Sequence, residues 1–191
     1  DQMGALTASQ VKAITTDDLV VLGSDQIAAI SSAAITGLTT DQVVALTTTQ
    51  MDKLTTGQMA ALTSAQVGAL ETRDLNKLTS DQVGAITTAS LRGLTTTQVA
   101  ALGTAQLSSL TTGQLVSMTT ASVAALTTAQ TVALTTDQVA ALTATQAKAI
   151  VTDDVAVLTS VQIASISTAS VAELTTDQVV ALTTTQMDKL T

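Results

Sequence analysis

Residues 39–46, Thr-Thr-Asp-Gln-Val-Val-Ala-Leu, show the pattern that the whole chain repeats. From Thr7 onward the sequence is a run of twenty-three such octads with no insertion or deletion, and an aliphatic residue or methionine closes each of them. We number the residues of an octad as positions 1 to 8. A short, strict period is typical of solenoids, in which each unit buries its apolar side chains only against neighbouring units. We therefore expect one continuous solenoid over residues 1–191.

A longer repeat lies above the octad. Residues 1–55 align without gaps with residues 137–191, and residues 38–55 are identical to residues 174–191. The superrepeat therefore spans residues 1–136, and residues 137–191 are a second, partial copy. Solenoids usually end in polar capping repeats, and neither end of this sequence has one. We expect an excerpt of a longer array, or a subunit whose ends are covered by identical neighbours.

The octad carries the signature of a helix start. Position 1 is Thr or Ser in nineteen of the twenty-three octads, and position 4 is Gln in sixteen. In such a capping box the hydroxyl accepts from the backbone N–H three residues on, while the Gln side chain accepts from the cap's own N–H. Positions 5 and 8 share a helical face, position 7 is mostly small, and position 6 varies as a solvent-facing site does.

One uninterrupted helix does not fit the period. At about 100° per residue, eight residues advance the helical face by about 80° each repeat, so the leucines would form no continuous stripe. We expect one short helix of about seven residues per octad, restarted by each Thr, in an all-α solenoid. The alternative is a β-solenoid, which the abundant Thr and Val favour. Strand alternation, however, would place Leu46 on the same face as Gln42.

Composition excludes several classes of protein. The chain has no Cys, His, Pro or aromatic residue, and its formal net charge is −8 with 46% hydrophobic residues. The negative charge disfavours nucleic acid as a partner. The longest aliphatic run is too short to span a bilayer. Because nearly every residue is repeated, no singular catalytic set stands out. We expect no enzyme activity and no catalytic, cofactor or metal site.

A few polar clusters are candidate sites of chemistry. Adjacent carboxylates could bind a metal or act as an acid–base pair, but at positions 3 and 4 they are expected near a helix N-terminus, with Asp in place of the capping Gln. The charged octad and the Asp-Lys pairs are expected on a solvated face, and the serines have no base for nucleophilic catalysis. The adjacent carboxylates are Asp17-Asp18 and Asp153-Asp154, and the charged octad contains Glu71-Thr72-Arg73-Asp74 and Asn76-Lys77. The Asp-Lys pairs are Asp52-Lys53 and Asp188-Lys189, and the serines are Ser90, Ser122 and Ser170.

Threonines give the most regular surface. Outward rows of Thr at matched spacing could bind ice or another ordered surface. If the first Thr caps a helix instead, its hydroxyl will be occupied by a backbone N–H. The sequence leaves both readings open, and they differ in where that hydroxyl points.

Two resemblances extend this reading. Residues 38–46 resemble the opening of the first helix in the repeats of TAL effectors, which supports a helix here; the base-reading loop and second helix of that repeat are missing, so DNA recognition is not implied. The tandem array over the whole chain is similar to repetitive segments of giant bacterial surface proteins, described as adhesin-like or haemolysin-like and commonly exported by type I secretion. That resemblance implies a secreted bacterial fibre, stalk or matrix spacer at the cell surface, whose partners are copies of itself, end-to-end or lateral, or an extracellular surface.

The assignment of faces makes a prediction. Leu46→Asp should unfold the array locally, because position 8 is assigned to the core and a buried, unpaired carboxylate costs several kcal/mol. Val44→Asp should change the melting temperature little, because position 6 is assigned to solvent. Thermal unfolding followed by circular dichroism compares the two variants, and equal losses would contradict the assignment.

Overall fold

The computed structural model describes residues 2–190, and within them all regular secondary structure is helical, with one 3-10 helix and twenty-three short α-helices. The predicted all-α solenoid of capped helices is confirmed. The described residues contain no strand, so the β-solenoid alternative is wrong. Each of the octads holds one helix, and α1 to α23 follow the octads in order.

The chain forms two compact units, Asp1–Leu102 and Gly103–Thr191. The predicted single solenoid over residues 1–191 stays a prediction. The first unit contains η1(Met3–Ala5), α1(Ala8–Ala13), α2(Thr16–Val21), α3(Ser24–Ala29), α4(Ser32–Ile35), α5(Thr40–Ala45), α6(Thr48–Asp52), α7(Thr56–Ala61), α8(Ser64–Ala69), α9(Thr72–Leu75), α10(Ser80–Ala85), α11(Thr88–Leu91) and α12(Thr96–Ala101). The second contains α13(Thr104–Ser108), α14(Thr112–Ser117), α15(Thr120–Ala124), α16(Thr128–Ala133), α17(Thr136–Ala141), α18(Ala144–Ala149), α19(Thr152–Val157), α20(Ser160–Ser165), α21(Thr168–Ala172), α22(Thr176–Ala181) and α23(Thr184–Met187).

Most of the helices begin with the same capping pattern, and α5 shows it together with an extended end that many of them share. In α5 the N-cap Thr39 is extended, its hydroxyl accepts from Gln42 N at 3.1 Å, and its own N–H donates to Gln42 Oε1 at 2.7 Å. Leu46 then leaves the helix at ψ 132°, and Thr47 follows at ψ 154°. Two extended residues in succession redirect the chain. The helices span four to six residues, fewer than the predicted seven or so, because the N-cap and at least one residue after the helix adopt other conformations in each octad.

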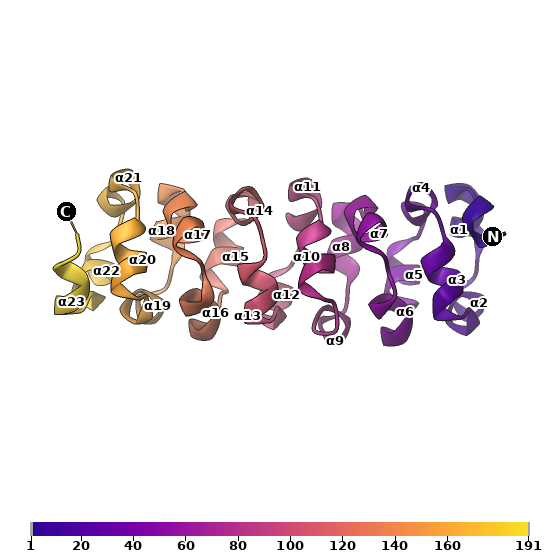
Figure 1. Ribbon diagram of the computed structural model, residues 1–191, viewed down its shortest axis with the longest axis horizontal. Coiled ribbons are helices and arrows are strands. Elements are labelled where there is room, and N and C mark those ends of the chain that lie inside the picture. Colours follow the sequence, from indigo (N-terminus) through magenta and orange to yellow (C-terminus); the bar gives the residue numbers. More distant parts are fainter. Residues whose placement is uncertain (1, 191) are drawn as a thin grey trace. The chain divides into compact units, whose positions relative to one another are not determined.

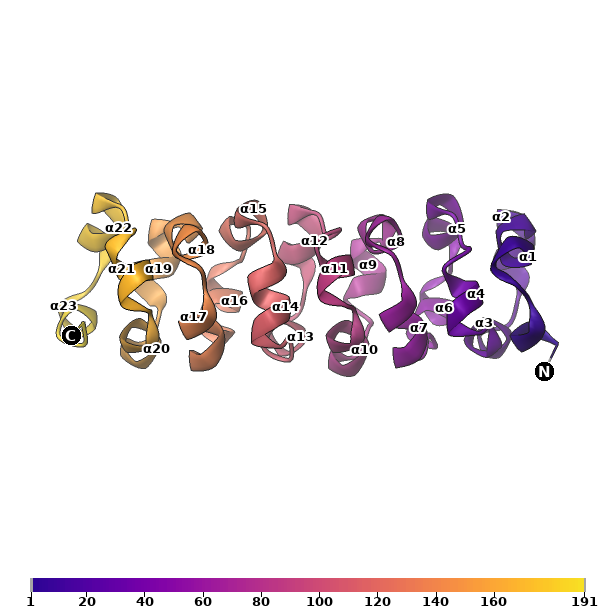
Figure 2. The same cartoon turned by 90° about the horizontal axis from the view of Figure 1, so that it is seen from above.

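Within each unit the chain coils so that helices three apart in the sequence pack together. Within the first unit α5 packs on α2 and α8, and within the second α18 packs on α15 and α21. Figure 1 and Figure 2 show this succession around each unit, with α4 beside α7 in the first. Because isolated helices of this length are unstable in water, these packing contacts hold them.

The core consists of positions 5 and 8, as predicted. Val43 and Leu46 are 2% and 1% exposed, whereas Val44 at position 6 is 41% exposed. The same two positions supply nearly every buried aliphatic side chain in both units. Position 4 is buried as well, which the sequence did not predict, and it holds Gln in most octads.

Small residues at position 7 permit close backbone approach, as expected. A Cβ built on Gly93 would lie 1.9 Å from the carbonyl oxygen of Ser64, and one on Gly37 would lie 2.1 Å from that of Ala8. Both neighbours are backbone atoms one turn earlier, so they cannot rotate aside. Glycine is therefore required at these two positions because the backbones lie so close together, and not because of the φ angles, which are ordinary.

Gly93→Ala should destabilise the first unit by about 1–3 kcal/mol, because the added methyl overlaps backbone. The matched control is Gly113→Ala in α14, where the new Cβ would meet only Thr111 Oγ1 at 4.0 Å. That control should be neutral or stabilising by up to about 1 kcal/mol through helix propensity. Urea titrations of both variants measure the difference.

Candidate functional site: the amide bridges at position 4

The position-4 glutamine is the most heavily bonded side chain in the repeat. In Gln58 the oxygen Oε1 accepts from Thr55 N at 2.8 Å, while Nε2 donates to the carbonyls of Ile27 at 2.9 Å and Ile30 at 2.8 Å. One primary amide thus closes its own helix start and reaches the end of a helix in the previous turn. We call the bonds from Nε2 to the earlier helix end an amide bridge.

Amide bridges recur with a fixed register. The eleven bridges named below each reach the position-8 carbonyl 28 residues earlier, and most also reach the position-5 carbonyl 31 residues earlier. The bridge therefore joins octads four apart, while helices three apart pack together. One superhelical turn takes more than three and fewer than four octads. The donors are Gln42, Gln50, Gln58, Gln66, Gln82 and Gln98 in the first unit and Gln138, Gln146, Gln162, Gln178 and Gln186 in the second.

The amide bridges supply hydrogen-bond partners for carbonyls that short helices leave unpaired. The last carbonyls of a helix have no partner within it, and in a four- to six-residue helix such groups are most of the backbone. An unpaired buried carbonyl costs about 1–3 kcal/mol. The amide supplies that partner from the next turn, and Gln58 itself is only 1% exposed.

Serine can replace glutamine at position 4 with a shorter reach. Ser90 Oγ donates to the carbonyl of Leu62 at 2.6 Å, and Ser170 Oγ donates to that of Leu142 at 3.1 Å, in the same 28-residue register. Ser122 also holds position 4, and its backbone N–H donates to the cap hydroxyl of Thr119. These serines therefore act in the repeat's own hydrogen-bond pattern.

Aspartate at position 4 is an acceptor where the bridge needs a donor. Asp154 is 2% exposed, and its Oδ2 accepts from the hydroxyl of Thr131 at 3.2 Å. Its counterpart Asp18 is exposed and accepts from the Thr15 hydroxyl at 2.7 Å. Both lie in the first turn of a helix, as predicted, and Asp17 and Asp153 beside them are exposed.

The charged octad differs from its prediction at one residue. Arg73, Asn76 and Lys77 are exposed, and Arg73 forms an ion pair with Glu71. The solvated-face prediction is wrong for Asp74, which is 1% exposed, because α9 packs on α6 and Asp74 lies at that contact. Asp74 Oδ1 accepts from the Thr48 hydroxyl at 2.6 Å, and Arg73 Nε lies 3.7 Å from Oδ2.

The remaining polar candidates stay at the surface. The side chains of Asp52-Lys53 and Asp188-Lys189 are exposed. Residues 2–190 contain no group of three His, Cys, Asp or Glu side chains placed to hold a metal ion. None of the helices in that range has the length and apolar character that crossing a membrane requires.

The first threonine of the octad is a cap. Its hydroxyl accepts from the backbone N–H of position 4, as in Thr55, Thr95 and Thr175, at 3.1–3.2 Å. The second threonine is mostly exposed. The prediction that the first hydroxyl caps a helix is therefore confirmed, and an outward row of threonines would have to come from the exposed second position.

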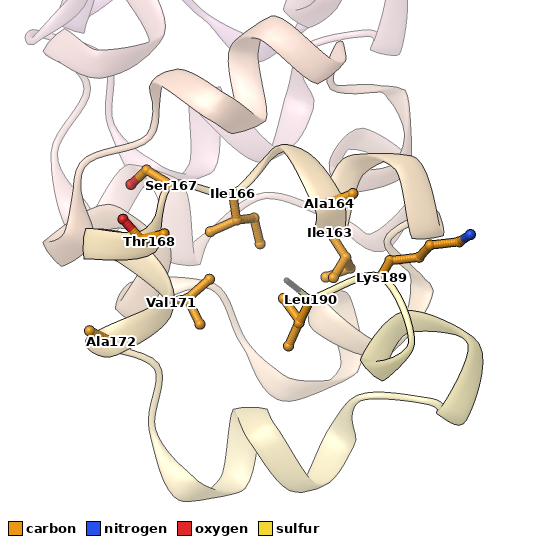
Figure 3. A pocket seen from close by; sticks show the side chains of 9 residues that line it. All are labelled: Ile163, Ala164, Ile166, Ser167, Thr168, Val171, Ala172, Lys189 and Leu190. Atoms are coloured by element: carbon orange, nitrogen blue, oxygen red, sulfur yellow. The ribbon is translucent and has the colours of Figure 1, made fainter.

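A cavity of about 480 Å³ lies in the second unit, lined by nine residues. Figure 3 shows Ile163, Ile166, Val171 and Leu190 gathered around it, with Lys189 directed outward. A smaller cavity of about 300 Å³ in the first unit is lined by Gln2, Met3, Asp25, Gln26 and Ala29. Neither holds a set of groups suited to acid–base chemistry.

Comparison with known proteins identifies the repeat. The sequence pattern described as the ALTTAQ repeat matches residues 1–32, 27–56, 51–88, 75–112, 109–144 and 147–184. The chain belongs to the ALTTAQ repeat family. Residues 125–130 spell that hexapeptide. No curated protein matches the chain.

Part of the ALTTAQ geometry was visible in the sequence and part was not. The capping box predicted the contact of Gln Oε1 with the cap. The second role of the amide, through Nε2, joins residues 28 apart, and no local pattern reports it. The regularity of Gln at position 4 exceeds what a cap alone requires, since Ser or Thr with any neighbour can cap a helix. This excess of Gln at position 4 was the one feature of the sequence that could have indicated a second role for the amide.

Gln58→Glu tests the amide bridge. Glu keeps an oxygen for Thr55 N but turns the Nε2 donor into a carboxylate oxygen facing two carbonyls, so we expect a loss of about 2–4 kcal/mol at neutral pH. The matched control is Gln10→Glu, because Gln10 is exposed and makes only its cap bonds. Chemical denaturation measures both, and equal effects would show that only the cap matters.

Asp154→Gln tests whether adding an amide where the bridge is missing stabilises the chain. The register of the other bridges would direct its new amide to the carbonyls of Val123 and Leu126, so the variant should gain about 1 kcal/mol. The control Asp153→Asn changes a neighbouring, exposed carboxylate to an amide without restoring a bridge. A rise in melting temperature for the first variant alone is the expected result.

Proposed function

We propose that this ALTTAQ protein is a structural repeat protein of a bacterial cell surface, acting as an extracellular fibre, stalk or matrix spacer. Membership of a tandem-repeat family and a fold of stacked helical layers support a structural role. The likeness of the sequence to repetitive segments of secreted surface proteins supports the extracellular location.

The observation that carries the proposal is the sameness of the layers. The same cap, the same packing of helices three apart and the same amide bridge recur in both units. Chemistry at an active site needs a few groups with environments of their own. The repeat instead distributes its polar groups among caps and bridges, where they determine geometry, and the proposal assigns the protein no enzyme activity.

Surface charge supports the choice of partners. The formal net charge of −8 repels nucleic acid. Exposed valines at positions 6 and 7, such as Val21 and Val180 at 78% and 82%, give small apolar spots suited to contact between copies. We propose copies of the chain as the principal partner.

Immunogold electron microscopy of the cells that produce the protein tests the location. Gold should lie outside the cell envelope, and brief protease treatment of intact cells should remove it. Gold confined to the cytosol and resistant to protease would contradict the proposal. An antibody against a cytosolic protein serves as the control for intact cells.

A further inference from the structure

Two departures from the octad pattern meet inside the second unit. Thr131 is the only polar residue at position 5 in the twenty-three octads, and Asp154 is one of three aspartates at position 4. They belong to α16 and α19, which pack on each other (Figure 1). Both side chains are buried, at 1% and 2% exposure, and the Thr131 hydroxyl donates to Asp154 Oδ2 at 3.2 Å. The two departures therefore compensate each other, because the hydroxyl supplies the donor that the carboxyl group needs.

A third departure makes Asp154 depend on this one donor. In the first unit Asp18 accepts from the hydroxyl of its own N-cap, Thr15, at 2.7 Å. The N-cap of α19 is Val151, which has no hydroxyl. Among the described residues, Thr131 supplies the only hydrogen-bond donor to the Asp154 carboxyl group. Asp18 thus has a partner within its octad, whereas the partner of Asp154 lies 23 residues away.

This dependence matters because a repeated sequence has several equivalent registers. If one whole octad bulges out of the coil, the next octad can take its place, and the contacts across the gap form again between residues of the same kind. Misassembly of this type is characteristic of repeat proteins. We call the result the shifted form. The amide bridges do not exclude it, because Gln recurs at position 4 in most octads.

Thr131 and Asp154 distinguish the native from the shifted form. Residues 135–142 and 143–150, two complete octads, lie between them. If either octad bulges out, the octad of Asp154 packs one octad further back, and Asp154 meets Val123 in place of Thr131. Valine has no hydrogen-bond donor in its side chain. The carboxyl group would then be buried without a partner, which is strongly unfavourable.

We propose that the Thr131–Asp154 hydrogen bond is a register lock, which keeps α19 packed on α16 in a chain whose other octads are nearly interchangeable. A buried polar pair often stabilises a fold less than apolar side chains of the same volume, but it discriminates between alternative packings. Specificity of register explains why these two departures occur together. The inference goes beyond the proposed structural role, since it concerns how the chain folds and holds wherever the protein is located.

Asp74 provides a contrast within the first unit. It is also buried at position 4, but its Oδ1 accepts from the hydroxyl of Thr48, at position 2 of the octad three places earlier. Position 2 is Thr or Ser in twenty-one of the twenty-three octads. A shift by one octad would therefore offer Asp74 the equivalent hydroxyl of Thr40. This pair does not distinguish the registers, and the proposal assigns it no lock.

Native-state proteolysis by trypsin tests the lock, because Lys148 lies in the octad 143–150, which bulges out in one shifted form. Trypsin cleaves a bulged octad, so the cleavage rate measures the population of that form. The decisive variant is Thr131→Val/Asp154→Gln, which gives both positions the commonest residue of the repeat. It should melt at a higher temperature than the wild type, yet cleavage after Lys148 should be at least about tenfold faster. Cleavage after Arg92, in the first unit, is the internal control and should not change.

The opposite changes in stability and cleavage separate a register lock from an ordinary stabilising contact. If the pair had no effect on register, a more stable chain would open less often, so unchanged or slower cleavage of the double variant would overturn the proposal. The single variant Thr131→Val should also speed cleavage after Lys148, but with a lower melting temperature, because it removes the donor from the native register. Mass spectrometry of the fragments 1–148 and 149–191 identifies the cut, and circular dichroism shows that each variant is folded.

Hydrogen exchange compares the two buried aspartates directly. Residues 135–150 are enclosed by the register lock, and residues 55–70 are enclosed in the same way by the pair that Asp74 makes. Exchange in residues 135–150 should be at least about tenfold faster in Thr131→Val/Asp154→Gln than in the wild type. Exchange in residues 55–70 should not be faster in Asp74→Gln. Faster exchange in both segments would overturn the proposal, because any buried aspartate would then oppose the shifted form.

Discussion

The amide of the position-4 glutamine is the interaction on which the rest of the structure depends. A helix of four to six residues cannot pair most of its own backbone N–H and C=O groups, because nearly all of them lie in its first or last turn. The amide presents an acceptor at one atom and a donor at another. It can therefore join the start of one helix to the end of another, as Gln58 does between Thr55 and Ile30.

This double use fixes the geometry of each unit. The oxygen holds the amide against its own cap, so the nitrogen can point only toward the preceding turn. Packing between helices three apart and bridging between octads four apart are compatible only if a turn takes an intermediate number of octads. Small side chains follow from that spacing, because Gly93 and Gly37 lie where neighbouring backbones nearly touch. Polar and apolar contacts thus specify one and the same coil.

The local parts of this fold were predictable from the sequence. Thr39 and Gln42 announce a cap, and Val43 and Leu46 define the buried face, because these relations act within one octad. The burial of position 4 was not predictable, since Gln is usually a surface residue and its acceptor lies 28 residues away. The prediction for Asp74 failed for the same reason, because its charge suggested solvent and its place in the repeat determined burial. Of the site, the caps were foreseen and the bridges were not.

The fixed separation of the bridged residues has an evolutionary consequence. Whether two residues of this chain are in contact depends mainly on the number of octads between them. The same contact, with the same separation, recurs at different places along the chain. Unequal recombination that adds or removes whole octads therefore keeps every surviving contact in register, whereas a change of any other length shifts all later glutamines away from their carbonyls. Such a gene can therefore gain or lose length without disrupting the fold only in whole octads. The alignment of residues 1–55 with 137–191 without a gap, identical over residues 38–55, is the trace that duplication in whole octads would leave.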